Sequence, residues 1–400
     1  MKIRIGRREH SLGRLLGVYV LGAGFAIVAR VLFLAPWRRP ARGRITLLGH
    51  SLAGNLEAFA RHVEASHPEL ELLVLIDEPD EYRRLRATSS RTVLSAQRLD
   101  HLARVARSEA VVSAMGPVFL RYWLSARNRP LFVDVWHGVG FKSRLAGDAN
   151  LLAYDAHFVS SPFTKAYYEK AGATAIVTGY ARTDVTLASA KDATARDRAL
   201  REFGRPHGDA TPIVLFAPTW KEAGAAPAAA GLYDVPLLTA LTGLDALAAR
   251  EGFLVAYRGH THSDAASFDA LGSVRSLGSD VFPITEELLG AVDVVVTDWS
   301  SIATDFLPLG RPVVYLDTTP PAATLAPLDA SDRPGAHVHD LDELLAAVGA
   351  AVSDPGEALA PFAQQRAATS TKAWGDTLDG GSSERYVTAL GSLTKTKVAR

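Results

Sequence analysis

Cysteine is absent from this chain of 400 residues, and several familiar site motifs are absent as well. The lack of cysteine excludes disulfide scaffolds, zinc–thiolate centres and cysteine nucleophiles. Neither GxGxxG nor GxxxxGK[ST] occurs, which argues against a dinucleotide-dependent dehydrogenase and a P-loop NTPase. The GxSxG elbow is also missing, which argues against an α/β-hydrolase. The function must therefore be sought in other residues.

The chain has no net charge, but its charges are unevenly distributed. Residues 1–44 contain ten Lys or Arg residues and one acidic residue, Glu9. The remaining residues contain 33 basic and 42 acidic side chains. This asymmetry predicts an anionic partner for the N-terminal end alone, and no nucleic-acid partner for the body.

The N-terminal segment also lacks a run long enough to span a membrane. Residues 15–29 are uncharged, Arg30 interrupts them, and an apolar stretch resumes up to Trp37. A spanning helix needs about 20 apolar residues and tolerates a central arginine poorly. A signal peptide is not indicated, because no convincing small-residue cleavage site precedes the arginine cluster. We expect residues 1–43 to be a membrane-associating segment with an apolar, basic helix over residues 15–37, which attaches peripherally to anionic lipid on the cytoplasmic side of the cell membrane. The alternative is a buried helix packed on the body.

From Arg44 onward, short apolar runs alternate with helical stretches. The expected strands are residues 45–48, 72–76, 110–113, 131–135, 157–160 and 175–178, followed by 213–216, 253–257, 294–296 and 312–316. This alternation predicts an α/β fold with helices on both faces of parallel sheets. We expect two doubly wound, Rossmann-like domains facing a central cleft. The expected segments are an acceptor domain (44–187), a linker (188–211), a donor domain (212–345) and C-terminal helices (346–400).

The segment 292–317 is the most informative part of the chain. Its apolar run stops at Thr297-Asp298, and Ser300-Ser301 follow where a helix would begin. Ligands of doubly wound sheets bind beyond the carboxyl ends of the strands. Hydroxyl groups beside free N–H groups of a helix N-terminus favour an anion site. The alternative is that Asp298 or Ser300 only caps the helix.

Other expected strand ends carry similar chemistry. His137 follows the strand 131–135, and a neutral imidazole there can accept a proton from an attacking hydroxyl group. The alternative is a histidine hydrogen-bonded inside its turn. Each of the other ends offers a cation or histidine beside glycine or a hydroxyl group. His260 and His262 form a possible metal pair, but no third ligand is tied to them by spacing, so no metal site is predicted.

Taken in order, five segments resemble the CDP-glycerol glycerophosphotransferase family, whose members build teichoic acids and related polyol-phosphate polymers. They are WHGVGFKS (136–143), GYARTD (179–184), APTWKE (217–222), RGH (258–260) and TEELLGAVDVVVTDWSSIATDF (285–306). The resemblance implies a GT-B-like fold, CDP-glycerol or a related CDP-polyol as donor, and attachment to the membrane. No cofactor is predicted.

The resemblance also implies roles for individual residues. His137 matches the catalytic base, His260 matches a second essential histidine near the donor phosphates, and Ser300 and Ser301 match the pair that holds the pyrophosphate. We expect Arg258 and Thr297 to join the phosphate site. Other residues expected in the cleft are Gly138, Lys142, Arg182, Thr219, Trp220, Lys221, Glu287 and Asp298. Glu286 is an alternative to Glu287 as a contact for the ribose.

The chain departs from the family pattern at three places. Val139-Gly140-Phe141 replace Thr-Pro-Leu, Thr261 replaces a proline after the second histidine, and Ala181 replaces a proline after Tyr180. These changes leave the acceptor and the polyol of the donor open.

The expected activity is transfer of glycerol phosphate from CDP-glycerol, or a related CDP-polyol, to a hydroxyl group of a lipid-linked glycan, with release of CMP. Two other classes of function remain as alternatives. One is a GT-B glycosyltransferase or nucleotide-sugar epimerase with a different nucleotide donor. The other is a binding protein for nucleotides or anionic lipid that catalyses no reaction.

Overall fold

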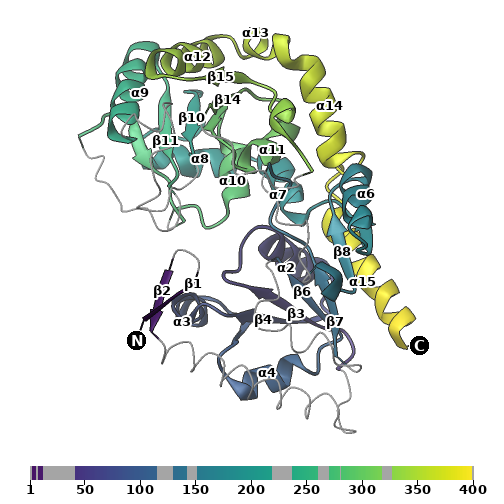
Figure 1. Ribbon diagram of the computed structural model, residues 1–400. Coiled ribbons are helices and arrows are strands. Elements are labelled where there is room, and N and C mark those ends of the chain that lie inside the picture. The colour runs from purple at the N-terminus through teal and green to yellow at the C-terminus, as the bar shows by residue number, and fades with distance from the viewer. Residues whose placement is uncertain are drawn as a thin grey trace.

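The computed structural model describes residues 2–5, 8–11, 41–114, 129–141, 151–218, 237–259, 270–279, 281–317 and 327–398. Its two α/β domains lie one above the other in Figure 1, and a pair of C-terminal helices runs along one side of both. Each domain is built on a parallel sheet, as the alternation of apolar runs predicts.

The N-terminal domain contains a seven-stranded sheet in the order β5-β4-β3-β6-β7-β8-β9. The chain starts at β3 in the middle and winds outward in both directions, so a switch point lies between β3 and β6. The strands are β3 (Arg44–Gly49), β4 (Glu71–Ile76), β5 (Thr92–Ser95), β6 (Ala110–Ser113), β7 (Leu131–Asp134), β8 (Ala156–Val159) and β9 (Ala175–Val177). The helices are α2 (Gly54–Ser66), α3 (Pro79–Thr88), α4 (Leu99–Val105) and α6 (Pro162–Lys170).

The C-terminal domain repeats this topology with six strands, in the order β12-β11-β10-β13-β14-β15. Its strands are β10 (Ile213–Phe216), β11 (Leu254–Tyr257), β12 (Val274–Ser276), β13 (Val294–Thr297), β14 (Val313–Leu316) and β15 (Ala336–Val338). Its helices are α8 (Ala193–Glu202), α9 (Leu237–Glu251), α10 (Thr285–Ala291), α11 (Ile302–Phe306), α12 (Leu341–Ser353) and α13 (Pro355–Leu359).

The β-branched run of β13 explains why this strand lies in the middle of its sheet. Val294 and Val296 pack into the apolar cluster that contains Leu244 of α9. Val295 points to the other face and joins the cluster that contains Leu288 of α10. Successive side chains of a strand alternate between faces, so a continuous apolar run indicates a strand covered by helices on both sides.

The two domains are joined by α7 (Ala181–Ser189) and by the returning helices α14 (Ala363–Trp374) and α15 (Ser382–Val398). Helix α15 reaches the N-terminal domain, where Tyr386 packs against Phe59 at 5.4 Å between ring centroids. Asp184 of α7 accepts hydrogen bonds from the N–H groups of Ser382 and Ser383, at 3.2 and 2.9 Å. A carboxylate at a helix N-terminus is favoured by the helix dipole. The last helix is thus part of the first domain.

Some elements differ from the sequence-based expectation. Strands β5, β12 and β15 and helix α3 were not expected, because three- or four-residue edge strands show little periodicity. The segment 188–211, expected to be a linker that begins with a helix-prone stretch, contains α8, whose Ala199 and Leu200 are buried in the core of the C-terminal domain.

The N-terminal segment is described only in part. It begins with an antiparallel hairpin of β1 (Lys2–Ile5) and β2 (Arg8–Ser11). The apolar helix expected over residues 15–37 lies outside the described residues. Within the described part of the chain, no helix combines the length and apolar character needed to cross a bilayer.

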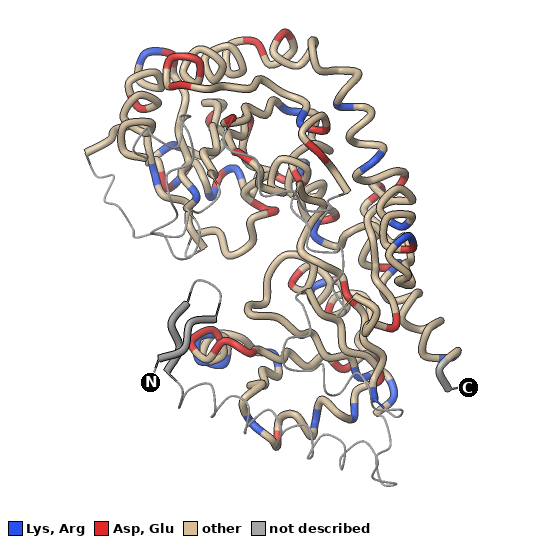
Figure 2. The backbone as a smooth tube through the Cα atoms, viewed as in Figure 1, with Lys and Arg blue, Asp and Glu red and all other residues tan. Residues whose placement is uncertain are grey.

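Basic and acidic residues are interspersed along both domains (Figure 2). Where the domains meet, Glu287 of α10 pairs with Arg61 of α2 at 2.8 Å and also with Arg198 of α8. An apolar cluster also draws on both domains and contains Val139, Phe141, Tyr180, Trp299, Leu328, Ala373 and Trp374. The junction is therefore held by both packing and charge.

Trp374 is the largest fully buried side chain among the described residues. Its Nε1–H donates to the carbonyl oxygen of Thr304 at 3.2 Å. We expect Trp374→Ala to lower the free energy of unfolding by about 3–5 kcal/mol, because it leaves a cavity at the domain junction. Urea denaturation followed by circular dichroism measures this change. The control is Leu238→Ala, at a side chain that is 56% exposed, with an expected change within about 0.5 kcal/mol. Equal effects of the two substitutions would contradict the role of Trp374.

Candidate active site

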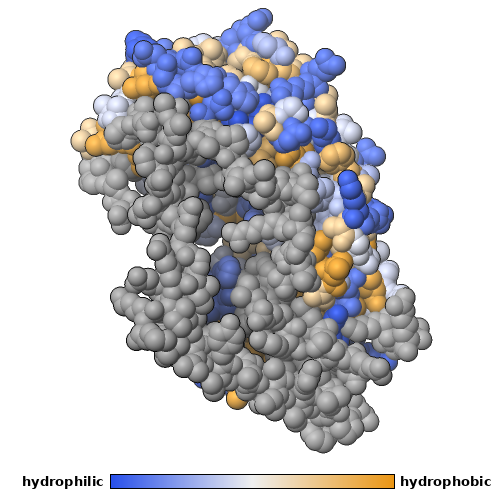
Figure 3. Space-filling view, in the orientation of Figure 1, coloured by the Kyte–Doolittle hydropathy of each residue, from blue (hydrophilic) through white to orange (hydrophobic). Residues whose placement is uncertain are grey.

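A cavity of about 380 Å³ lies between the domains, at the carboxyl ends of strands from both sheets. The space-filling view shows a hollow between the two domains with hydrophilic surface in its depth (Figure 3). The wall consists of residues that follow β7, β10, β11 and β13, together with residues of α7, α10 and α11. They are Trp136, His137, Gly138, Gly140, Phe141, Arg182, Ala217, Pro218, Arg258, Gly259, Thr285, Glu286, Trp299, Ser300, Ser301, Ile302 and Asp305.

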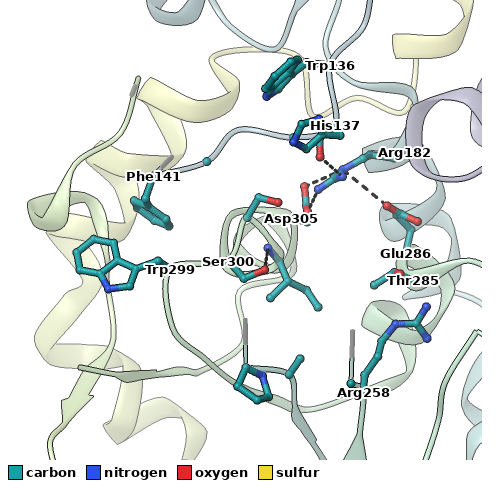
Figure 4. A pocket seen from close by; sticks show the side chains of 17 residues that line it. Trp136, His137, Phe141, Arg182, Arg258, Thr285, Glu286, Trp299, Ser300 and Asp305 are labelled. Carbon is teal, nitrogen blue, oxygen red and sulfur yellow. Dashed lines mark hydrogen bonds and ion pairs between the residues drawn. The ribbon is translucent and has the colours of Figure 1, made fainter. Parts of the chain in front are cut away.

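His137 lies in a tight turn directly after β7. Trp136 has a positive φ of 44° and Gly138 a φ of 138°, so the backbone on both sides of the histidine is in a region that L-residues rarely adopt. Asn55 of α2 holds this turn by donating to the carbonyl oxygens of Val135 and Trp136, at 2.8 and 3.0 Å. The turn presents the His137 side chain to the cavity (Figure 4).

The surroundings of His137 favour its neutral form. Desolvation within the cleft lowers the pKa of His137, and the positive charge of Arg182 lowers it further. A hydrogen bond with the backbone of Ala114 and the charge of Asp134 oppose this shift. The side chain keeps access to solvent, but the walls of the cleft displace much of the water around it. The imidazole is therefore neutral at neutral pH and able to accept a proton.

Arg182 is buried at the point where the two domains meet. Its Nε donates to Asp305 Oδ1 at 3.0 Å, and a second nitrogen pairs with the same carboxylate. Its Nη1 donates to the carbonyl oxygen of His137 at 2.5 Å, and Glu286 Oε1 lies 3.7 Å from Nε (Figure 4). Burial lowers the pKa of Arg182, and Glu286 opposes that change. The guanidinium thus ties the histidine turn to two helices of the C-terminal domain.

Ser300 and Ser301 line the cavity at the start of the short helix α11. The Oγ of Ser300 accepts a long hydrogen bond from the N–H of Ile302, at 3.4 Å. Ser301 is the N-cap residue, yet its side chain makes no capping hydrogen bond. Its carbonyl oxygen instead accepts from Thr304 Oγ1 at 2.7 Å and from the N–H of Asp305 at 3.0 Å. The hydroxyl group of Ser300 therefore caps the helix only weakly, and the hydroxyl group of Ser301 does not cap it.

The other expected phosphate ligands hold parts of the wall together. The guanidinium of Arg258 donates to the carbonyl oxygens of Leu277, Gly278 and Phe282, at 2.9, 3.3 and 3.1 Å. Thr297 is fully buried and donates to the carbonyl oxygen of Ala217 at 2.7 Å, which joins the ends of β13 and β10. Arg258 contributes to the cavity wall, whereas Thr297 lies behind it.

Two expected acidic contacts are also placed away from the cavity wall. Asp298 is fully buried, and Glu287 forms the ion pairs with Arg61 and Arg198. The neighbouring Glu286 lines the cavity instead. Adjacent residues of a helix are about 100° apart around its axis, so only one of the two glutamates faces the cleft.

Five expected site residues lie outside the described residues. In the chain, Lys142 follows Phe141, the triplet Thr219, Trp220 and Lys221 follows Pro218, and His260 follows Gly259. Phe141, Pro218 and Gly259 all line the cavity. Residues of the cavity wall thus directly precede Lys142, Thr219 and His260 in the chain.

Several residues that shape this site are not among the expected site residues, and three of them have structural roles that can be named. Asp305 follows Ser301 by four residues, so its position on the same face of the helix could have indicated it. Trp299 belongs to the segment 285–306, which alone assigns it no contact; the guanidinium carbon of the buried Arg333 lies over its ring, 4.0 Å from the ring centroid. Asn55 lies about 80 residues before the turn that it holds, and no local pattern indicates that contact.

The paired parallel sheets and the polar cleft at their strand ends define a two-domain α/β protein with a GT-B-like fold. The family model described as CDP-Glycerol:Poly(glycerophosphate) glycerophosphotransferase matches residues 37–390, and the chain belongs to this family. This match confirms the family expected from the five segments. Among curated proteins, no relative matches by sequence.

Solved structures with the same fold include the wall teichoic acid polymerase TagF, at a TM-score of 0.72 and 14% identity, covering 97% of this chain and 100% of that one. A histidine variant of TagF soaked with CDPG matches with the same values. A putative UDP-N-acetylglucosamine 2-epimerase from Listeria monocytogenes has a TM-score of 0.55 and 16% identity, covering 89% of this chain and 98% of that one. At these identities, the likenesses establish the fold, and the family match separates this chain from the epimerases.

Gly138 leaves no room for a side chain. A β-carbon there would lie 2.8 Å from Arg182 Nη2 and 3.0 Å from Ser301 Oγ. We expect Gly138→Ala to reduce turnover with CDP-glycerol on the order of 10²-fold, because it displaces groups on both sides of the cleft. Release of CMP measures this. Gly204→Ala is the control, since Gly204 also has a positive φ (68°) but no atom within 4 Å of its β-carbon position. A loss as large in the control would show that backbone strain alone is responsible.

Proposed function

We propose that this enzyme moves glycerol phosphate from CDP-glycerol, or a related CDP-polyol, to a hydroxyl group of a lipid-linked glycan. The observation that carries the proposal is the neutral His137 at a cavity that Ser300 and Ser301 also line. One domain thus supplies a base and the other supplies hydroxyl groups for a phosphorylated donor. Family membership supplies the donor class.

In the proposed reaction, the acceptor oxygen attacks the β-phosphorus of the donor. His137 takes the proton of that hydroxyl group, the bond from the β-phosphorus to the bridging oxygen breaks, and CMP leaves with the electron pair. Phosphoryl transfer depends mainly on positioning and on stabilisation of charge. Ser300 and Ser301 would donate hydrogen bonds to the pyrophosphate oxygens. His260 is proposed to act beside the donor phosphates.

Arg182 is proposed to position His137 rather than to bind the donor. Its charge is balanced by Asp305 and Glu286, and its Nη1 holds the carbonyl oxygen of His137. A guanidinium that is already committed to two carboxylates attracts a further anion weakly. Desolvation is the main cause of the lowered pKa of His137, and the charge of Arg182 lowers that pKa further, which is the second proposed contribution of Arg182.

His137→Ala should reduce kcat by about 10²–10⁴-fold, the usual contribution of a general base. Binding of CDP-glycerol, measured by calorimetry, should persist, because the base acts on the acceptor. The control is His207→Ala, at a histidine whose side chain is 85% exposed and pairs with Asp197. Full turnover in correctly folded His137→Ala protein would refute the assignment.

The pH profile of the wild-type enzyme provides a further check on the same assignment. The pKa of His137 is lowered from 6.5, so its basic form persists below that pH and is lost only as the pH falls through the lowered value. The acidic limb of kcat/KM should therefore lie below pH 6.5 and be absent in His137→Ala. A limb above that pH would contradict the environment described for His137.

We also propose that residues 1–43 hold the enzyme on the cytoplasmic face of the cell membrane, where a lipid-linked acceptor is accessible. The excess of ten basic residues over one acidic residue in 1–44 supports this proposal. Deletion of residues 1–40 should abolish co-sedimentation with anionic liposomes, and vesicles of neutral lipid are the control. Unchanged sedimentation of the truncated protein with anionic vesicles would exclude this role.

A further inference from the structure

Two histidines and a glutamate from opposite ends of the chain meet on the outside of the N-terminal domain. His62 lies in α2, His67 is the C-cap residue of that helix, and Glu384 lies in the first turn of α15. The Nε2 atoms of the histidines lie 3.0 and 2.7 Å from the same oxygen, Oε2 of Glu384. All three ligand atoms lie within 4.8 Å of one another.

These distances suit a small divalent metal ion. Zinc binds imidazole nitrogen and carboxylate oxygen at about 2.0–2.2 Å, which places tetrahedral ligand atoms about 3.4 Å apart. The two nitrogen–oxygen spacings of 3.0 and 2.7 Å need to open by about 0.4 and 0.7 Å to admit the ion. Two imidazoles and one carboxylate also form a ligand set that binds zinc in preference to magnesium.

A second observation points to the same ligand. The other ring nitrogen of His67, Nδ1, lies 3.2 Å from Glu69 Oε1. Histidines that bind metal usually donate their second N–H to a carboxylate or a carbonyl group, which fixes the tautomer and the direction of the ring. The contact with Glu69 leaves Nε2 of His67 as the nitrogen aimed at Glu384.

We propose that His62, His67 and Glu384 bind one Zn²⁺ ion, which clamps α15 onto α2. Glu384 has a 53% exposed side chain, so water has access to the fourth position of a tetrahedral site. Two residues further on, Tyr386 is already buried against Phe59. The ion would fix the rim of this apolar contact and thus secure the helix that returns from the C-terminal domain. None of the three ligands lines the active-site cavity.

The simpler explanation is a pair of surface contacts that need no metal. When the imidazoles are protonated, the same groups form ion pairs with Glu384. Exposed ion pairs contribute little to stability, about 0–1 kcal/mol. The two explanations differ in one measurable respect, because ion pairs alone predict no saturable binding of zinc.

The test uses the full chain, freed of metal with a chelator and then titrated with ZnCl₂ by calorimetry. We expect one equivalent to bind and the thermal unfolding midpoint to rise with the zinc concentration. His67→Gln and Glu384→Gln should each weaken binding by more than tenfold, and Glu69→Gln by about 10–100-fold. MgCl₂ should leave the midpoint unchanged.

The matched control is His207→Gln, which removes a surface histidine with a single carboxylate partner, Asp197. Its zinc affinity should equal that of the wild type. Absence of saturable binding near one equivalent would overturn the proposal. Equal affinity in the wild type, His67→Gln and Glu384→Gln would also overturn it, since it would place the zinc on other residues.

Discussion

The cleft between the two domains is organised around one buried guanidinium, that of Arg182. Moving an arginine out of water costs several kcal/mol, and good geometry with opposite charges is needed to offset it. Arg182 meets this need with Asp305 and Glu286, which belong to different helices of the C-terminal domain. Its backbone N–H is bound by Asn55 Oδ1 at 3.1 Å, and Asn55 also holds the strained turn after β7. The position of His137 therefore depends on groups from both domains.

The charged groups and the hydroxyl groups of the cleft therefore have different roles. The guanidiniums of Arg182 and Arg258, which both line the cavity, are engaged with carboxylates and carbonyl groups of the protein. Within the described residues, the polar groups that we propose to contact the donor are therefore the hydroxyl groups of Ser300 and Ser301 and nearby backbone groups. Such groups recognise a pyrophosphate by direction rather than by net charge. Further positive charge in the sequence follows Phe141 and Pro218, as Lys142 and Lys221.

Much of the fold could be predicted because its information is local. A run such as Val294–Thr297 is apolar at every position before its end, which predicts a strand covered on both faces and places the following serines at the edge of the sheet. The direction of single side chains could not be predicted in this way. Thr297 and Ser300 are three residues apart, yet one bonds to β10 and the other faces the cavity. The choice between Glu286 and Glu287 likewise depends on Arg61, Arg182 and Arg198, which come from distant elements.

The return of α15 to the first domain has a consequence for synthesis of the protein. Phe59 and Phe158 emerge from a ribosome well before their partner Tyr386, which follows both of them at a long distance in the sequence. Until then, the N-terminal sheet has its strands but lacks the helix that covers this part of its apolar face. Contacts so distant along the chain form late, and the apolar face that α15 has not yet covered is prone to aggregation. The N-terminal domain therefore completes its core only after the C-terminal domain and α15 have been synthesised.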